Sequence, residues 1–192
     1  MRSDLAALAA VLLWGSLASL AISLDTVPPL LMTGIGLVVG SLIALPVSGF
    51  RIRRLLPRKR VLLVGVYGLL GYHFALFAGL QNAPSVQANL VNYLWPILVV
   101  LLAPLFIKGT SLTYKHWIAG ILGFSGAALA ILSGTELVGG FAVGYVYAGI
   151  AALIFSSYSL MSKSLADSPT AAVGGYSFVA GVLSIGAHLV FE

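Results

Sequence analysis

The side chains best suited to binding a solute lie between Val86 and Pro96, inside an otherwise apolar stretch. At helical spacing, Asn89, Asn92 and Tyr93 fall on the side that also carries the final proline. Two amides near the middle of a bilayer are costly if they face lipid, so they should face protein or a wet cavity. This pattern predicts a polar site within the membrane, although amides that only bridge neighbouring helices would give the same pattern.

Pro96 should disturb this helix, because proline has no N–H to donate to the carbonyl four residues earlier. The carbonyl of Asn92 then needs another partner, which a neighbouring helix, water or a ligand can supply. Tyr93 and Trp95 lie beside this kink. Aromatic rings with polar edges line many small-molecule sites, so the sequence predicts a helix kink at Pro96 next to a binding surface.

A second group of candidates, Tyr67, Tyr72 and His73, lies in the preceding apolar stretch. His73 is the most deeply placed titratable group of the sequence. Ionisable groups within the membrane are candidates for function. Two interpretations stay open for His73, a structural hydrogen-bonding role and a part in proton coupling.

Several kinds of chemistry have no residues to support them. The chain has no cysteine, which excludes disulfides, thiolate nucleophiles and zinc–thiolate sites. No phosphate-binding glycine loop is present, and no acidic or basic residue lies deep in an apolar stretch. We therefore expect no catalytic residues, no metal and no cofactor, and the chain is not predicted to be an enzyme.

The elements that carry these residues are predicted to be transmembrane helices. Of the 192 residues 60% are apolar and 8% are charged, whereas soluble domains carry roughly 25% charged residues. The mean hydropathy is +1.07. A helix needs about 20 apolar residues to cross a bilayer. Seven stretches qualify, near Leu5–Leu24, Pro29–Val47, Val61–Gln81, Val86–Ile107, Trp117–Ser133, Phe141–Ser162 and Ala171–Val190. The sequence predicts an all-α membrane protein of about seven transmembrane helices.

The charged residues indicate the orientation. With a cytoplasmic N-terminus, the inner segments contain every Lys and Arg, namely Arg2, Arg51, Arg53, Arg54, Arg58, Lys59, Arg60, Lys108, Lys115 and Lys163. The outer segments contain Asp25, Glu136 and Glu192. Basic residues in short loops resist translocation, so this distribution predicts a multi-pass protein with its N-terminus inside. It also explains the net charge of +5 without nucleic acid, which we do not expect as a partner.

An internal repeat relates the first two predicted helices to the last two. A displacement of 141 residues places Trp14 on Phe155, Pro28 on Pro169 and Gly34 on Gly175 without a gap. Five helices separate the two copies, so the second copy enters the membrane from the opposite side. Inverted repeats of this kind are typical of secondary transporters, which bind substrate near the midplane between the repeats.

The repeat predicts two parts, residues 1–140 as a first five-helix repeat and residues 141–192 as the first two helices of an inverted second repeat. Completing the second repeat would take roughly another hundred residues, at about 20 per span plus loops. We therefore expect the chain to be a fragment of a longer protein.

The string from Val91 to Pro96, the early Trp14 and the polar hairpin of the third and fourth predicted helices carry a resemblance. In these features the chain resembles the drug/metabolite transporter superfamily, EamA-type. Within it, the chain is similar to the aromatic amino acid exporter group. The resemblance implies ten helices in two inverted five-helix repeats, and export of amino acids across the cell inner membrane. Matched positions imply a substrate-binding set of Trp14, Tyr72, His73, Asn92, Tyr93 and Trp95.

On this reading the partners are a small-molecule substrate and the lipid bilayer, and the oligomeric state stays open. So does the choice between facilitated export and ion coupling. A non-transporting membrane subunit or fragment is an alternative function. A seven-helix receptor or retinal protein is less well supported, because Ala171–Val190 has no lysine for a Schiff base.

Overall fold

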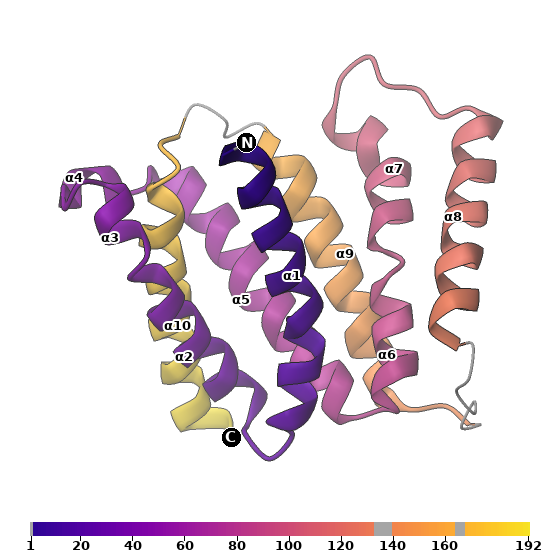
Figure 1. Ribbon diagram of the computed structural model, residues 1–192, viewed down its shortest axis with the longest axis horizontal. Coiled ribbons are helices and arrows are strands. Elements are labelled where there is room, and N and C mark those ends of the chain that lie inside the picture. The colour runs from indigo at the N-terminus through magenta and orange to yellow at the C-terminus, as the bar shows by residue number, and fades with distance from the viewer. Residues whose placement is uncertain (1, 133–139, 164–167) are drawn as a thin grey trace.

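The computed structural model describes residues 2–132, 140–163 and 168–192. These residues form helices and no strand (Figure 1). The helices are α1 (Arg2–Ser23), α2 (Pro29–Ser41), α3 (Ala44–Val47), α4 (Ile52–Leu55), α5 (Lys59–Gln81), α6 (Ser85–Asn92), α7 (Trp95–Phe106), α8 (Tyr114–Leu132), α9 (Val143–Lys163) and α10 (Ala172–Phe191). Two loops predicted from the sequence, Thr135–Gly140 and Lys163–Pro169, lie mostly outside the described residues, as does Glu136.

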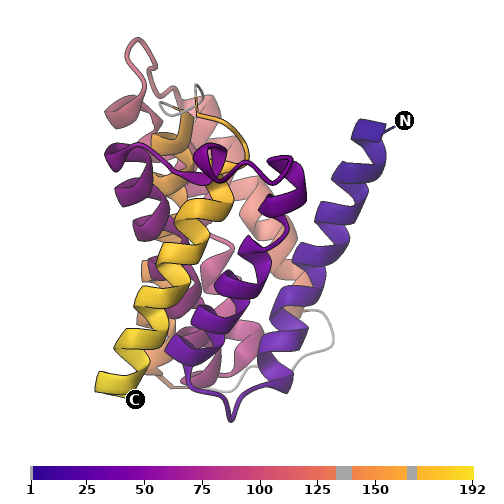
Figure 2. The ribbon, with the colours of Figure 1, turned by 90° about the vertical axis from the view of Figure 1, so that its left-hand side faces the viewer.

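The prediction of an all-helical membrane protein is confirmed. Five segments are long and apolar enough to cross a membrane: Pro29–Val47, Lys59–Gln81, Ser85–Phe106, Val143–Lys163 and Ala172–Phe191. A shorter apolar helix covers Ala7–Ser23. The long helices run side by side in alternating directions, and α1 stands at the edge of the bundle (Figure 2). The short helix α4, within the basic loop, was not predicted from the sequence.

The fourth predicted span is broken into α6 and α7 at Tyr93 and Leu94. The N–H of Leu94 donates to the carbonyl of Val91 at 3.1 Å, which is a tighter turn than an α-helix makes. Pro96 lies in the first turn of α7, where a missing N–H costs nothing because no helical partner exists. The proline therefore falls just after the break, and the backbone reorients at Tyr93.

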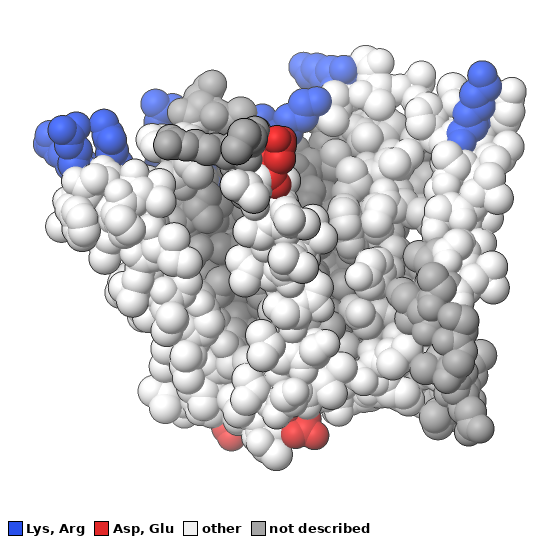
Figure 3. Space-filling view, viewed as in Figure 1, with Lys and Arg blue, Asp and Glu red and all other residues white. Residues whose placement is uncertain are grey.

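Charge separates the two ends of the bundle. The described Lys and Arg side chains gather at one end, which we call the basic end (Figure 3). The helix α1, with Asp4 in its first turn, begins at this end. The opposite end, called here the far end, is where α1 ends just before Asp25 and where α10 ends just before Glu192. The apolar flanks of the helices between these two ends carry exposed leucine, isoleucine and valine side chains. Such a surface suits lipid on the flanks and water at the ends.

Close contacts between antiparallel helices hold the bundle together. The most extensive contacts join α5 to α9 and α2 to α10. In the second pair, a Cβ at Gly34 would lie 3.0 Å from the carbonyl oxygen of Gly181. Small residues let helix backbones approach this closely in lipid, where close packing replaces the hydrophobic effect.

Not every glycine of these helices is a packing site. Gly36 and Gly40 of α2 form a motif typical of helix contacts, yet a Cβ at either would meet nothing within 4 Å. The same holds for Gly123 and Gly126 of α8. The contact face of α2 is centred on Gly34 instead, because that face meets α10.

Thr33 offers a test of this packing. It is buried in α2, and its Oγ1 has no hydrogen-bond partner. An unsatisfied buried polar group costs about 1–3 kcal/mol, so the nearly isosteric Thr33→Val should raise the melting temperature in detergent. Thr33→Ser, which keeps the hydroxyl, should not. A lower Tm for the valine variant would show that the hydroxyl has a hydrogen-bond partner after all.

Candidate functional site

All six residues predicted as a substrate-binding set line one cavity of about 540 Å³. The cavity lies between α1, α5, α9 and the broken helix α6–α7. Its six predicted members are Trp14, Tyr72, His73, Asn92, Tyr93 and Trp95, and the lining is completed by Val11, Gly15, Leu17, Gly68, Leu69, Leu76, Asn89, Phe155 and Tyr158. The fold thus brings residues from four separate parts of the chain to one place.

Phe155 of α9 is the centre of the aromatic wall. Its ring centroid lies 4.9 Å from that of Tyr72 and 4.9 Å from that of Trp95. Trp14 meets it edge-on at 5.8 Å. Sequence reasoning did not include Phe155 in the site, although the repeat had already aligned it with Trp14. That alignment was the available signal, because equivalent positions of inverted repeats face a shared midplane.

Asn92 supplies a polar atom without a partner. The residue is 5% exposed, and its Oδ1 accepts no hydrogen bond. Its amide group interacts with the hydroxyl of Tyr72. Buried amide oxygens are rarely left unpaired, since desolvation without compensation costs about 1–3 kcal/mol. An acceptor of this kind on a cavity wall can take a hydrogen bond from a bound solute.

His73 is fixed by its neighbours. Its Nδ1 lies 2.7 Å from the carbonyl oxygen of Leu69, and because a carbonyl only accepts, Nδ1 is the donor. In the neutral ring Nε2 is then a second acceptor. Edge-on packing against Tyr72, at 5.1 Å between centroids, holds the ring in place. Among the described residues, no group of His, Asp and Glu could hold a metal ion.

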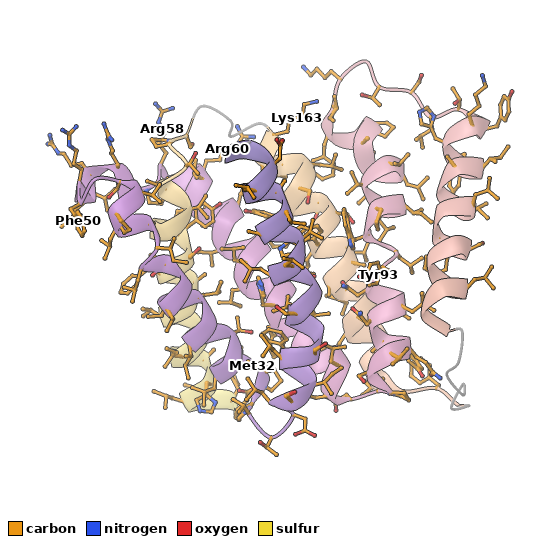
Figure 4. The ribbon with its side chains drawn as sticks, viewed as in Figure 1. Met32, Phe50, Arg58, Arg60, Tyr93 and Lys163 are labelled. Atoms are coloured by element: carbon orange, nitrogen blue, oxygen red, sulfur yellow. The ribbon has the colours of Figure 1, made fainter. Side chains whose placement is uncertain are left out.

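Tyr93 lies at the break between α6 and α7 and belongs to two cavities (Figure 4). The second cavity, of about 380 Å³, lies between α7 and α8 and is lined mainly by apolar atoms, with Pro96 among its residues. Ser156 of α9 donates to the carbonyl oxygen of Trp95 at 2.9 Å, which fastens the start of α7 to α9. The break therefore positions Tyr93 and Trp95 on the same cavity from adjacent turns.

Ionised side chains are missing from the described lining of the central cavity. Its walls offer aromatic faces, hydroxyl groups, amides and one imidazole. Such a surface can hold a neutral or zwitterionic solute with an apolar part through ring contacts and hydrogen bonds. It offers no charged partner for an ionised substrate side chain.

A helical membrane bundle around a polar and aromatic cavity is the architecture of a small-molecule transporter. The EamA-like transporter family matches residues 1–132, and the chain belongs to this family. The predicted resemblance is therefore confirmed. The family consists of membrane transporters and not of enzymes, and the apolar helices agree with a multi-pass membrane protein.

A protein from Ancylobacter novellus named aromatic amino acid exporter YddG is 36% identical over 191 residues. The match covers 95% of this chain and 66% of that protein. A solved crystal structure of a protein with 35% identity superposes with a TM-score of 0.78. That superposition covers 96% of this chain and 65% of the solved chain. The chain thus spans slightly less than two thirds of the length of the relatives it matches.

Proposed function

We propose that this chain acts as a carrier that exports small metabolites, aromatic and other neutral amino acids above all, by alternating access. The observation that carries the proposal is the central cavity, where three aromatic rings surround Phe155 next to the unpaired Oδ1 of Asn92. The name of the Ancylobacter relative supports the same substrate class. The carrier activity is proposed for the protein that contains these helices.

In this proposal, the ring of the substrate packs against Trp95 and Phe155, and Trp14 covers it from α1. The ammonium group donates to Asn92 Oδ1 and to Nε2 of His73. The carboxylate accepts from hydroxyl and amide donors such as Tyr72. Offset and edge-on aromatic pairs each contribute about 0.5–1.5 kcal/mol beyond the burial of area, so the rings favour Trp, Tyr and Phe over small amino acids.

We further propose that the basic end faces the cytoplasm and that the protein resides in the cell inner membrane. The one-sided distribution of Lys and Arg supports this orientation. Residues 1–140 are proposed as the first repeat, and residues 141–192 as the beginning of an inverted second repeat. The antiparallel packing of α2 on α10, which the repeat aligns with each other, supports that division.

The cavity favours facilitated export over tight ion coupling. Because the described lining contains no Asp, Glu, Lys or Arg, His73 is the candidate left for a proton relay. Solute counterflow in proteoliposomes tests both points, with labelled Trp, Phe and alanine, a sugar and a cationic drug as the panel. Uptake of Trp and Phe that persists with a protonophore is the expected result.

The same assay separates the carrier from a non-transporting subunit. Folded protein that binds Trp but gives no counterflow, alone or as part of a chain of the relative's full length, would support the subunit. Counterflow of the sugar at the rate of Trp would contradict the substrate class. Gel filtration in detergent, run in parallel, shows that each sample is folded.

Trp95→Ala tests the aromatic wall. Loss of one stacking partner should weaken the apparent affinity for Trp by roughly two- to tenfold more than that for alanine. Counterflow competition with unlabelled amino acids measures both affinities in one preparation. Trp117→Ala, on the exposed surface of α8 outside the described cavity lining, is the matched control and should change neither. Equal losses for Trp and alanine in Trp95→Ala would contradict stacking.

A further inference from the structure

A smaller pocket of about 220 Å³ lies at the basic end, between α5, α9 and α10. Hydroxyl side chains from three residues, Ser162, Ser168 and Thr170, contribute to its lining. Two basic residues lie at this end of the molecule, namely Lys163, the last residue of α9, and Arg60, the second residue of α5 (Figure 4). The pocket is therefore a recess with a mixed polar and apolar lining, beside the charged rim of the protein.

Tyr158 lines both this recess and the central cavity, so its side chain lies between the two spaces. Its hydroxyl lies 3.1 Å from that of Tyr176 in α10, and this hydrogen bond bridges α9 and α10. Tyr176 is 8% exposed and lines the recess on the same side. The hydroxyl pair thus spans the boundary between recess and cavity.

Both rings lie directly on glycines of α5. A Cβ added at Gly65 would overlap the ring of Tyr176, and a Cβ at Gly68 would overlap the ring of Tyr158. The two glycines are about one helical turn apart, so together they leave a surface of α5 without side chains, and the rings pack against this surface. No side chain of α5 interlocks with the rings at these positions. Such rings can swing away once their hydrogen bond breaks.

The far end of the same helices is packed quite differently. There α5, α6 and α9 meet through a buried cluster of small and apolar residues that includes Ala75, Ala88 and Ala148. A Cβ at Gly79 would lie 3.1 Å from the backbone of α9, so the two backbones are nearly in contact. At the basic end, by contrast, the contacts of α5 with the two tyrosines are rings against glycines, and these contacts can open without parting two backbones. We therefore take the far end as the pivot and the basic end as the moving part.

We propose that Tyr158 and Tyr176 form the gate between the central cavity and the basic end, and that the recess is the entry site for neutral amino acid solutes. Opening breaks the hydroxyl pair and lifts the rings from Gly65 and Gly68. The hydroxyl groups of the recess form hydrogen bonds with the solute before it passes the tyrosines. The part that this gate plays in transport rests on the carrier function proposed above. The barrier itself is a property of this fold, and labelling can measure it without substrate.

The absence of cysteine from the sequence gives a clean test, because one introduced cysteine is the only thiol. Thr170→Cys reports on the recess, and Asn89→Cys reports on the central cavity. A membrane-impermeant maleimide is added to one side of proteoliposomes, and the side that labels Thr170→Cys defines the basic end. From that side, Asn89→Cys should react more slowly than Thr170→Cys. Equal rates would show that no barrier exists and would overturn the proposal.

Tyr176→Phe removes the hydroxyl pair without changing ring size. Labelling of Asn89→Cys from the basic end should then rise about fivefold, the change expected for the loss of one net protein hydrogen bond. Labelling of Thr170→Cys should stay the same. Tyr67→Phe is the matched control, because it removes another bond between α5 and α9, to Ser157 at 2.8 Å, outside both spaces. A similar rise in Tyr67→Phe would indicate general loosening and would overturn the assignment of the gate.

Gly65→Ala tests the gate independently by displacing the ring of Tyr176. It should raise labelling of Asn89→Cys from the basic end, whereas Gly71→Ala should not, since a Cβ there meets the flexible Ile154 side chain at 3.2 Å. This variant decides the question if Tyr176→Phe does not fold. Unchanged labelling in a folded Gly65→Ala would overturn the proposal. If labelling behaves as expected but no amino acid is transported, the gate stands and the proposed function fails.

Discussion

Replacing Asn92 with leucine is expected to lower transport efficiency for every amino acid substrate by about 10- to 100-fold, the range for losing a hydrogen bond to a charged group. The unpaired Oδ1 of Asn92 is the proposed acceptor for the ammonium group, which all amino acids share. The loss should therefore be uniform across Trp, Phe and alanine. Counterflow rates at several substrate concentrations measure it as a fall in kcat/KM.

This uniform loss separates the role of Asn92 from that of the aromatic wall, since Trp95→Ala should discriminate between substrates. Thr33→Val is the matched control, because it also removes a buried polar atom without a partner but lies outside the central cavity. It should leave transport unchanged. A loss in Asn92→Leu confined to aromatic substrates would contradict an ammonium acceptor and place the amide against the ring instead.

Replacing Gly144 with valine is expected to prevent stable folding of the bundle. A Cβ at this position would lie 2.5 Å from the carbonyl oxygen of Gly79 and 2.7 Å from Cβ of Ala83. The N–H of Gly144 also donates to the carbonyl of Asn82 at 3.1 Å, so neither segment can shift without losing this bond. Overpacking usually costs about 1–3 kcal/mol, and a clash with backbone belongs at or above the upper end of that range.

Thermal unfolding in detergent, followed by gel filtration, measures the effect. Gly144→Val should lose its monodisperse peak at temperatures where the parent protein keeps it. Gly36→Val is the control, because it makes the same change within a helix at a position with nothing within 4 Å of the new Cβ. Equal destabilisation in both variants would mean that the helix propensity of valine, and not the contact between α5 and α9, explains the loss.

The amino-acid sequence was enough to predict the class of protein, the approximate positions of the long helices and three of the four parts of the chain that line the central cavity. Lipid accepts a chain only where about 20 residues are apolar, so composition and loop charges locate the spans without knowledge of packing. A disturbance near Pro96 was predictable from the missing N–H of proline, and the structure places Pro96 in the first turn of α7, just after the break. The polar and aromatic residues of α5 and α6 were recognisable because polar side chains are exceptional in an apolar stretch.

Which faces of the helices meet depends on tertiary packing. Packing places Phe155 and Tyr158 of α9 in the lining of the cavity. It also makes Gly34 the contact with α10, whereas Gly36 and Gly40 meet nothing. In a membrane helix nearly every face is apolar, so hydrophobic periodicity does not mark the buried side. Close backbone approach marks that side instead, and such contact depends on the partner helix, which is far away in the sequence.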